Sequence, residues 1–240
     1  MSTFQTEFID VQQYKVLISK VPDSCSKASI ALAFEHTEYW WISGQITFKY
    51  FRDGDYVNKI QIIMDNNGYS DKYINKYNDK VLSAAKTIAD NAKKQNTVYK
   101  RIKYIHDYLI SYIDYGKGKD DFSPHSTYGA LINKLCTCGG YAKTFVYIAR
   151  LVGIEAIVIN GNTVNGSHFW NYVKIDNIWY LIDLTFDDPG KDEQTPRYTF
   201  FLIGWGDQNY KDHYKESIAL AMGLKYPTLS ETNYKRPNLV

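Results

Sequence analysis

Hydrophobic residues recur at helical spacing in several stretches of the chain. In one stretch, Val81, Leu82, Ala85 and Ile88 fall on a single face, as apolar positions three and four residues apart do in an amphipathic helix. Another such stretch ends at Gly153, a residue type that favours the C-terminal cap of a helix. The predicted helices span residues 27–35, 74–94, 98–113, 138–152 and 214–222.

Other stretches alternate between apolar and polar residues, which predicts β-strands. A polar loop at 116–126 separates the helices before it from the helix and strands after it. The predicted strands span residues 14–21, 45–52, 56–64, 154–160, 168–175, 178–186 and 198–203. Since no Pro/Ser/Gly-rich linker interrupts the chain, we expect one compact unit. In it, an N-terminal α/β segment (1–95) packs on a core formed by residues 96–240 with a C-terminal extension.

The composition is that of a globular protein with a sizeable core. The chain has 240 residues, 45% of them hydrophobic and 22% charged, which excludes disordered and collagen-like classes. A net charge of +2 is too small to indicate nucleic acid as a partner. No apolar run reaches the roughly 18 residues that a membrane span needs. The first residues lack the apolar region of a signal peptide, so the protein either stays inside the cell or has lost an export signal.

Three cysteines, Cys25, Cys136 and Cys138, are too few for a disulfide framework. Cys136 and Cys138 could supply two zinc ligands, but a structural zinc site needs about four, and the sequence has no second cysteine pair. No loop has the spaced carboxylates of a calcium-binding EF-hand. We therefore predict neither a metal ion nor a cofactor.

Cys138 is the cysteine with a chemically suitable position. It is predicted at the start of helix 138–152, where unpaired amides and the positive end of the helix dipole stabilise a thiolate. Gly139 and Gly140 follow directly and would let a substrate backbone approach the thiol. A cysteine nucleophile also needs an imidazole that exchanges protons and a group that orients this imidazole.

The register of a predicted hairpin supplies both groups. Asp176 and Asn177 separate two alternating runs by two residues, as in a tight hairpin turn in which Ile175 pairs with Ile178.

In this register Trp170 lies opposite Asp183, and His168 lies opposite Thr185. His168 and Asp183 are then diagonal neighbours on one face, at a distance that two polar side chains can bridge. A slip of one residue would place them on opposite faces. The simplest hairpin therefore predicts an imidazole–carboxylate pair.

These residues fall in blocks that resemble the transglutaminase-like superfamily, in particular its bacterial branch. The resemblance covers about residues 102–201, and the spaced blocks are specific only in combination. The blocks are Ile105–Leu109, Tyr128–Leu131, Cys138–Lys143 (CGGYAK), Gly153–Ile154, His168–Asn171 (HFWN) and Trp179–Pro189 (WYLIDLTFDDP).

The resemblance implies a papain-like α+β fold in which the helix that carries the nucleophile packs on an antiparallel sheet. It implies that Cys138 is the nucleophile, His168 the base and acid, and Asp183 the orienting group. Phe169 stands where the family has a small residue, and Phe186 where it has tryptophan. These departures affect the shape of the substrate pocket and leave the catalytic groups in place.

The expected function is thiol-dependent acyl transfer on peptide or protein carboxamides through an acyl-enzyme, which gives crosslinking, deamidation or hydrolysis. An oxyanion intermediate needs preorganised donors. The Cys138 amide is the first candidate donor and Tyr128 the second, and Trp170 is expected to exclude water from the imidazole. Two alternatives stay open: a cysteine peptidase or amidase of cell-wall or secreted peptides, and a catalytically idle binding module. Members of this branch are often exported, which suggests a secreted or cell-surface location if a signal was removed.

Overall fold

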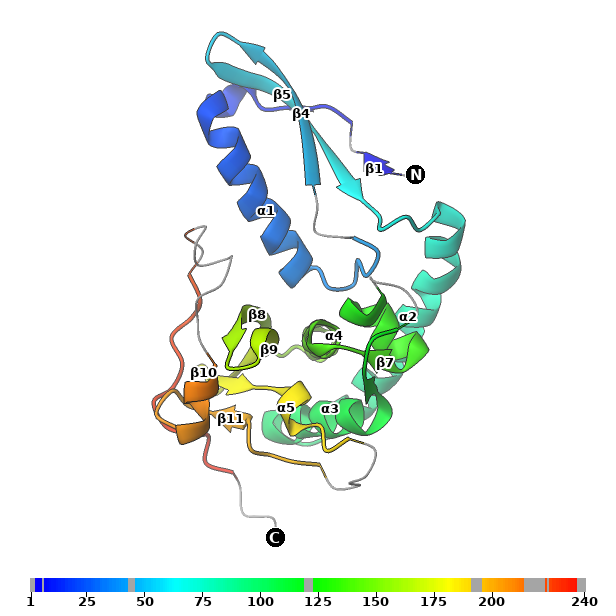
Figure 1. Ribbon diagram of the computed structural model, residues 1–240, viewed down its shortest axis with the longest axis vertical. Helices are drawn as coiled ribbons and strands as arrows, with labels where there is room; N and C mark the ends of the chain where they lie inside the picture. Colours follow the sequence, from blue (N-terminus) through cyan, green and yellow to red (C-terminus); the bar gives the residue numbers. More distant parts are fainter. Residues whose placement is uncertain are drawn as a thin grey trace. The chain divides into compact units, whose positions relative to one another are not determined.

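A computed structural model describes residues 3–5, 7–42, 46–118, 123–190, 196–213, 223 and 225–236. The chain divides into two compact units, Met1–Asn78 and Asp79–Val240 (Figure 1). The division falls inside helix α2 (Asp71–Lys93), whereas the sequence placed a boundary after residue 95 within one compact unit.

The first unit is built around the long strand β5, with which every other strand of its antiparallel sheet pairs. Helix α1 packs on this sheet, and Val21, Cys25 and Val57 form the buried centre. The elements are β1 (Thr3–Gln5), β2 (Ile9–Asp10), β3 (Val16–Leu17), α1 (Val21–Glu35), β4 (Ile46–Asp53) and β5 (Tyr56–Asp65).

The strand predicted over residues 14–21 is reduced to the two residues of β3. Lys15 adopts a positive φ of 48°, which interrupts an extended backbone. Helix α1 already begins at Val21, with Pro22 in its first turn, a position that proline favours. The helix predicted to begin at residue 27 is therefore longer than expected.

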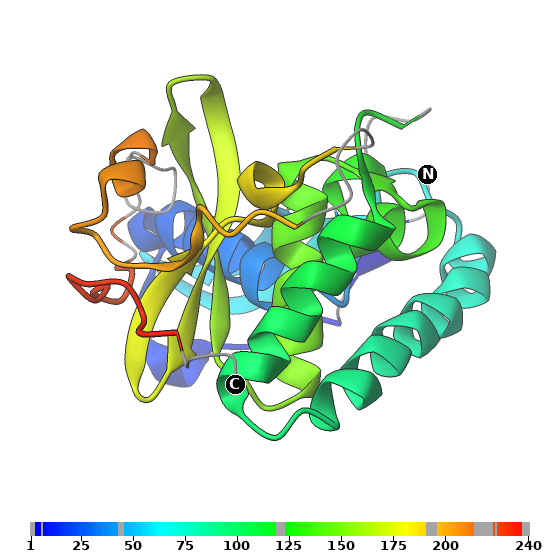
Figure 2. The ribbon, with the colours of Figure 1, turned by 90° about the horizontal axis from the view of Figure 1, so that it is seen from below.

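The second unit has two of the predicted helices, α3 and α4, layered on a four-stranded antiparallel sheet with the order β11-β10-β9-β8. Figure 2 shows α4 between this sheet and α3. The α+β class, with the helix that begins at Cys138 packed on an antiparallel sheet, is confirmed. The elements are α3 (Val98–Tyr112), α4 (Cys138–Leu151), β8 (Ala156–Thr163), β9 (Gly166–Ile175), β10 (Ile178–Ile182), α5 (Leu184–Asp187) and β11 (Phe201–Ile203).

The hairpin between β9 and β10 has the predicted turn and register. Asp176 and Asn177 both have positive φ, 52° and 63°, as a type I′ turn requires. Ile175 pairs with Ile178, and the ladder continues in the expected register as far as Ile182.

The ladder ends at Ile182, so the predicted pairs beyond it do not form. Asp183 instead caps the short helix α5, where its Oδ1 atom accepts the amides of Thr185 (2.9 Å) and Phe186 (3.1 Å). The strand predicted over residues 178–186 is therefore too long, because a carboxylate at an N-cap stabilises a helix start. His168 pairs with Gly161 of β8 and has no partner on β10.

A short parallel pairing leads into α4. Tyr115 of β6 (Asp114–Tyr115) lies beside Cys136 of β7 (Leu135–Cys136). The helix expected at 214–222 lies outside the described residues, and the C-terminal strand expected at 198–203 is the shorter β11. Among the residues described, no helix is both long and apolar enough to cross a membrane.

Candidate active site

Cys138 is the first residue of α4, and its side chain is half-buried. The loop is fixed on both sides of it: the Thr137 amide donates to the Pro124 carbonyl (2.9 Å), and the Gly140 amide donates to the Thr137 carbonyl (3.0 Å). The amide of Cys138 belongs to the first turn, whose N–H groups have no partner inside a helix. Thiol and amide therefore lie together at the positive end of a 14-residue helix.

Gly140, in the first turn of α4, packs so closely against the segment that precedes the helix that no larger residue fits. A Cβ atom there would lie 2.4 Å from the Cβ of Cys136 and 2.7 Å from the carbonyl oxygen of Pro124, far inside contact distance. The expectation that this glycine admits a substrate is wrong. At Gly139 a Cβ would have ordinary contact distances of 3.6 Å or more.

His168 and Asp183 form the expected pair. The Nε2 atom of His168 lies 2.7 Å from Oδ2 of Asp183, and both side chains are buried. The imidazole stacks on Phe186, with ring centroids 4.6 Å apart. Because Nε2 is held by the carboxylate, Nδ1 is the ring nitrogen left for the thiol of Cys138, with which the imidazole interacts.

The charges of the site stabilise one another. Burial alone would lower the pKa of His168, but the charge and hydrogen bond of Asp183, assisted by Cys138, raise this pKa to about 10. Burial alone would raise the pKa of Asp183, but His168 and His213 hold this pKa well below its usual range. The pair is therefore an imidazolium–carboxylate pair at neutral pH.

Asp183 has a second imidazole partner that the sequence did not indicate. The Nε2 atom of His213 lies 2.9 Å from the same Oδ2 atom that His168 contacts. His213 follows the 3₁₀ helix η5 (Gln208–Asp212) and is buried.

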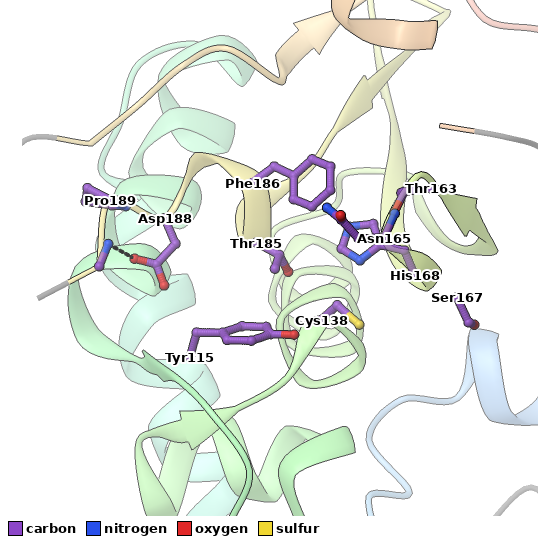
Figure 3. Close-up of a pocket in the computed structure, with 11 residues that line it drawn as sticks. Tyr115, Cys138, Thr163, Asn165, Ser167, His168, Thr185, Phe186, Asp188 and Pro189 are labelled. Carbon is purple, nitrogen blue, oxygen red and sulfur yellow. Dashed lines mark hydrogen bonds between the residues drawn. The ribbon is translucent and has the colours of Figure 1, made fainter. Parts of the chain in front are cut away.

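A pocket of about 420 Å³ opens over Cys138 and His168. Figure 3 shows its wall, in which Tyr115 extends across the pocket with its hydroxyl toward Cys138. Burial, and then the charge of Cys138, raise the pKa of Tyr115. Among the described lining residues Asp188 is the one carboxylate, and none is Lys or Arg. The remaining lining residues are Thr163, Asn165, Ser167, Thr185, Phe186, Pro189 and Gly190.

The two lesser sequence candidates lie away from this wall. Tyr128 is buried at the start of helix η4 (Gly129–Asn133) and does not line the pocket. Trp170 is buried behind the imidazoles, with its ring 6.0 Å from that of His168 and 4.8 Å from that of His213. Tyr115 was missed because its approach to Cys138 depends on the pairing of β6 with β7, which has no local sequence signal.

One cluster has the donor types of a metal site. The ligand atoms of His168, Asp183 and His213 lie within 4.8 Å of one another. Both imidazoles direct Nε2 at the same carboxylate oxygen at hydrogen-bond distance, so hydrogen bonds account for these close contacts. The observed geometry is that of a hydrogen-bond network.

A helix that begins with a cysteine thus packs on a sheet that carries a histidine beside an aspartate, as the resemblance to the transglutaminase-like superfamily implied. Residues 85–184 match the model of the Transglutaminase-like superfamily, which confirms the resemblance read from the sequence. The match supports a cysteine-dependent reaction for this part of the chain.

Individual relatives are distant. Human kyphoscoliosis peptidase is 24% identical over 131 residues, which cover 47% of this chain and 19% of that protein; the match thus spans about a fifth of the relative's length. The crystal structure of a TGase aligns with 63% of this chain and 46% of its own, at 14% identity and a TM-score of 0.43. The periplasmic domain of TgpA from Pseudomonas aeruginosa aligns over 59% and 62%, at 11% identity and a TM-score of 0.35.

Proposed function

We propose that the protein is a thiol-dependent acyltransferase that acts on carboxamides of peptides or proteins. The observation that carries this proposal is the chain of contacts from the pocket inward: Cys138 at a helix N-terminus, His168 beside it, and Asp183 on the far ring nitrogen. A thiol, an imidazole and an orienting carboxylate are the groups that nucleophilic acyl transfer needs.

In the first step the Cys138 thiolate attacks the carbonyl carbon, and a carbon–sulfur bond forms. The carbon–nitrogen bond then breaks, and the leaving amine or ammonia takes the proton from Nδ1 of His168. In the second step an acceptor attacks the thioester and gives its proton to Nδ1, which releases the Cys138 thiolate. Asp183 holds the ring through Nε2 in both steps and stabilises the imidazolium.

The oxyanion of each tetrahedral intermediate needs two donors on one side of the thiol. The amide of Cys138 supplies the first. Tyr115 is favoured over Tyr128 as the second, because the hydroxyl of Tyr115 points into the pocket toward Cys138. Tyr115 belongs to β6, and the Gly116 amide donates to the Cys136 carbonyl (2.9 Å), so the hydroxyl is carried on fixed backbone.

The walls of the pocket favour a neutral group. Thr163, Asn165 and Ser167 offer uncharged polar atoms, which suit a carboxamide better than a carboxylate. The pocket is open, so both water and an amine can reach the thioester. Hydrolysis of a peptide bond is therefore the second candidate, supported by the similarity to kyphoscoliosis peptidase.

The test is capture of the acyl-enzyme. The full chain is incubated with a mixture of glutamine-containing peptides, together with either a dansylated primary amine or hydroxylamine. We expect mass spectrometry to detect peptides that carry the amine or a hydroxamate, and an acyl adduct on the Cys138 peptide. Peptide cleavage with hydroxamate at the new C-terminus would assign the peptidase reaction instead.

Cys138→Ala should lower this turnover by a factor on the order of 10⁴ or more. Cys25→Ala is the matched control, since this buried thiol belongs to the first unit and should be dispensable for turnover. If the Cys138→Ala variant remains active, the proposed nucleophile is wrong. If the wild type forms no adduct with any peptide, the idle binding module is favoured.

A further inference from the structure

Asp183 is shared by two imidazoles, although the proposed mechanism uses one. Its Oδ2 atom lies 2.7 Å from Nε2 of His168 and 2.9 Å from Nε2 of His213, and its Oδ1 atom accepts the amides of Thr185 and Phe186. The carboxylate is fully buried. We propose that His213 is a positioning residue that acts through Asp183, as a hydrogen-bond donor that fixes the carboxylate and limits its pull on the proton of His168.

This inference rests on the proposed function, since it assigns His213 to the same site. Hydrogen bonds in the preceding 3₁₀ helix hold the backbone of His213 in place. Its amide donates to the Tyr210 carbonyl (3.0 Å) at the end of η5. The start of η5 is capped by Asp207, whose Oδ1 atom accepts the Asn209 amide at 2.8 Å. Asp207 is in turn bound by the side chain of Asn233.

The ring of His213 has apolar surroundings and one hydrogen-bond partner among the described residues. The ring lies among Trp170, Phe186 and Phe200, with centroids 4.8, 5.4 and 5.3 Å away. Its Nδ1 atom is buried and has no hydrogen-bond partner among the described residues. Among the described residues, the contact from Nε2 to Asp183 is therefore the one hydrogen bond that the ring of His213 makes.

His168 differs from His213 in the surroundings of its Nδ1 atom. On the Nδ1 side of His168 lie the thiol of Cys138 and the pocket, so a proton there can be exchanged. Of the other ionisable groups near the network, Tyr115 on β6 and Asp187 on α5 interact with the charge of Asp183, and neither contacts His213. The two imidazoles thus have different roles: His168 exchanges a proton, and His213 holds the carboxylate of Asp183.

These roles predict the direction in which the titration midpoint of His168 shifts when His213 is replaced. A donor on Oδ2 spreads the negative charge of Asp183 and weakens its attraction for the imidazolium. If His213 donates in this way, its removal makes Asp183 a stronger partner and raises the titration midpoint of His168. If His213 only supports packing, its removal loosens Asp183, and the midpoint of His168 falls toward that of a free histidine.

The experiment compares His213→Phe with His213→Gln in the full chain. Phenylalanine fills the space among the surrounding aromatic rings but supplies no hydrogen-bond donor. The glutamine amide can place an N–H group where Nε2 of His213 lay. The midpoint of His168 is followed by ¹⁵N NMR of the histidine rings, with His168→Ala to assign the signal. This readout needs neither a substrate nor a reactive thiol, so it can succeed even if the proposed reaction is wrong.

We expect His213→Phe to raise the midpoint of His168 by on the order of one pH unit, and His213→Gln to restore the wild-type value. His36→Phe, which changes an exposed histidine of the first unit, should leave it unchanged. The proposal is overturned if the midpoint falls or does not move in His213→Phe, or if His213→Gln behaves like the phenylalanine variant. Far-UV circular dichroism checks that the variants fold.

Discussion

Asp183 combines two functions that are usually divided between residues. One carboxylate oxygen caps α5 through two backbone amides, and the other accepts two imidazoles. A buried carboxylate needs such compensation, because an unpaired charge in the interior is very costly. The cap fixes the orientation of the carboxylate, and the second oxygen then meets His168 without further adjustment. The helix cap that follows β10 is thus also part of the candidate active site.

Tyr115 provides the first prediction at the residue scale. Tyr115→Phe removes one hydroxyl and keeps the ring, so we expect substrate binding to change little. The rate of the chemical step should fall about 10²-fold, as for the loss of one oxyanion donor. The measurement is the single-turnover rate of thioester formation with the peptide selected by the acyl-enzyme assay.

Tyr128→Phe is the matched control for Tyr115→Phe. Its hydroxyl belongs to a buried tyrosine that does not line the pocket, so the single-turnover rate should stay close to that of the wild type. A loss confined to Tyr128→Phe would assign the second oxyanion donor to the residue that the sequence had indicated, and equal losses in the two variants would contradict a specific role for the Tyr115 hydroxyl.

At the scale of elements, the position of α5 depends on a second buried histidine–aspartate pair. The Nε2 atom of His106 on α3 lies 3.2 Å from Oδ2 of Asp187 on α5, and both side chains are fully buried. The Oδ1 atom of Asp187 accepts the Phe200 amide at 2.9 Å, and the amide of Asp183 donates to the Phe200 carbonyl at 3.1 Å. This network links α3 to the segment that carries Asp183.

Asp187→Ala should therefore destabilise the protein strongly. The change leaves the imidazole of His106 and the amide of Phe200 without a buried partner, and breaking a buried pair from one side costs about 3–5 kcal/mol. Urea denaturation gives the free energy of unfolding.

Asp107→Ala is the control for Asp187→Ala. It removes the carboxylate on the other nitrogen of the same imidazole, Nδ1 of His106 (2.9 Å), at a site with 27% exposure, where the loss should be smaller. A loss for Asp187→Ala no larger than that for Asp107→Ala would contradict the role of the buried network.

The sequence could predict elements whose signals are local. The Asp176–Asn177 turn determines the register of β9 and β10, and helical periodicity with Gly153 as cap gives the bounds of α4. The end of β10 was missed because an aspartate after an alternating run reads equally well as a strand residue or an N-cap. The capping interaction that decided between them depends on the backbone path after residue 183.

The candidate site was predictable where its residues lie in contiguous blocks. Cys138, His168 and Asp183 each belong to such a block, and the structure brings them together. Tyr115 and His213 reach the site through non-local contacts, the first by the parallel pairing of β6 with β7 and the second through η5. The sequence around each of them has neither a spacing nor a composition that could have indicated this.

At the scale of the whole molecule, the net charge is small, and the large pKa shifts have local causes. A net charge of +2 over 240 residues gives little long-range potential. Large pKa shifts occur in the second unit, where the pKa of His168 is raised to about 10 and the pKa of Asp183 is lowered. The pKa of His106 is also raised, by its two carboxylate partners against the effect of burial. Folding stability should therefore vary with pH even though the net charge is small.

The sign of this variation follows from proton binding. Between about pH 6.5, where a histidine titrates in the unfolded chain, and pH 10, the folded state holds a proton on His168 that the unfolded state has lost. Stability must fall as pH rises through this window. At the acid end, the lowered pKa of Asp183 contributes stability that is present above about pH 4 and lost as pH falls further. The raised pKa of Asp187 opposes that acid loss in part.

We therefore expect the free energy of unfolding to be largest near pH 5–6 and to decrease by on the order of 4–5 kcal/mol by pH 10. Urea denaturation at a series of pH values measures this dependence. In Asp183→Asn the amide cannot hold the imidazolium, so the pKa of His168 should return toward its ordinary value and the decrease between pH 6.5 and 10 should shrink. An equal decrease in wild type and Asp183→Asn would show that other groups, and not the His168–Asp183 pair, govern the alkaline loss. His106 is the next histidine with a raised pKa, and His106→Gln would then test it in the same assay.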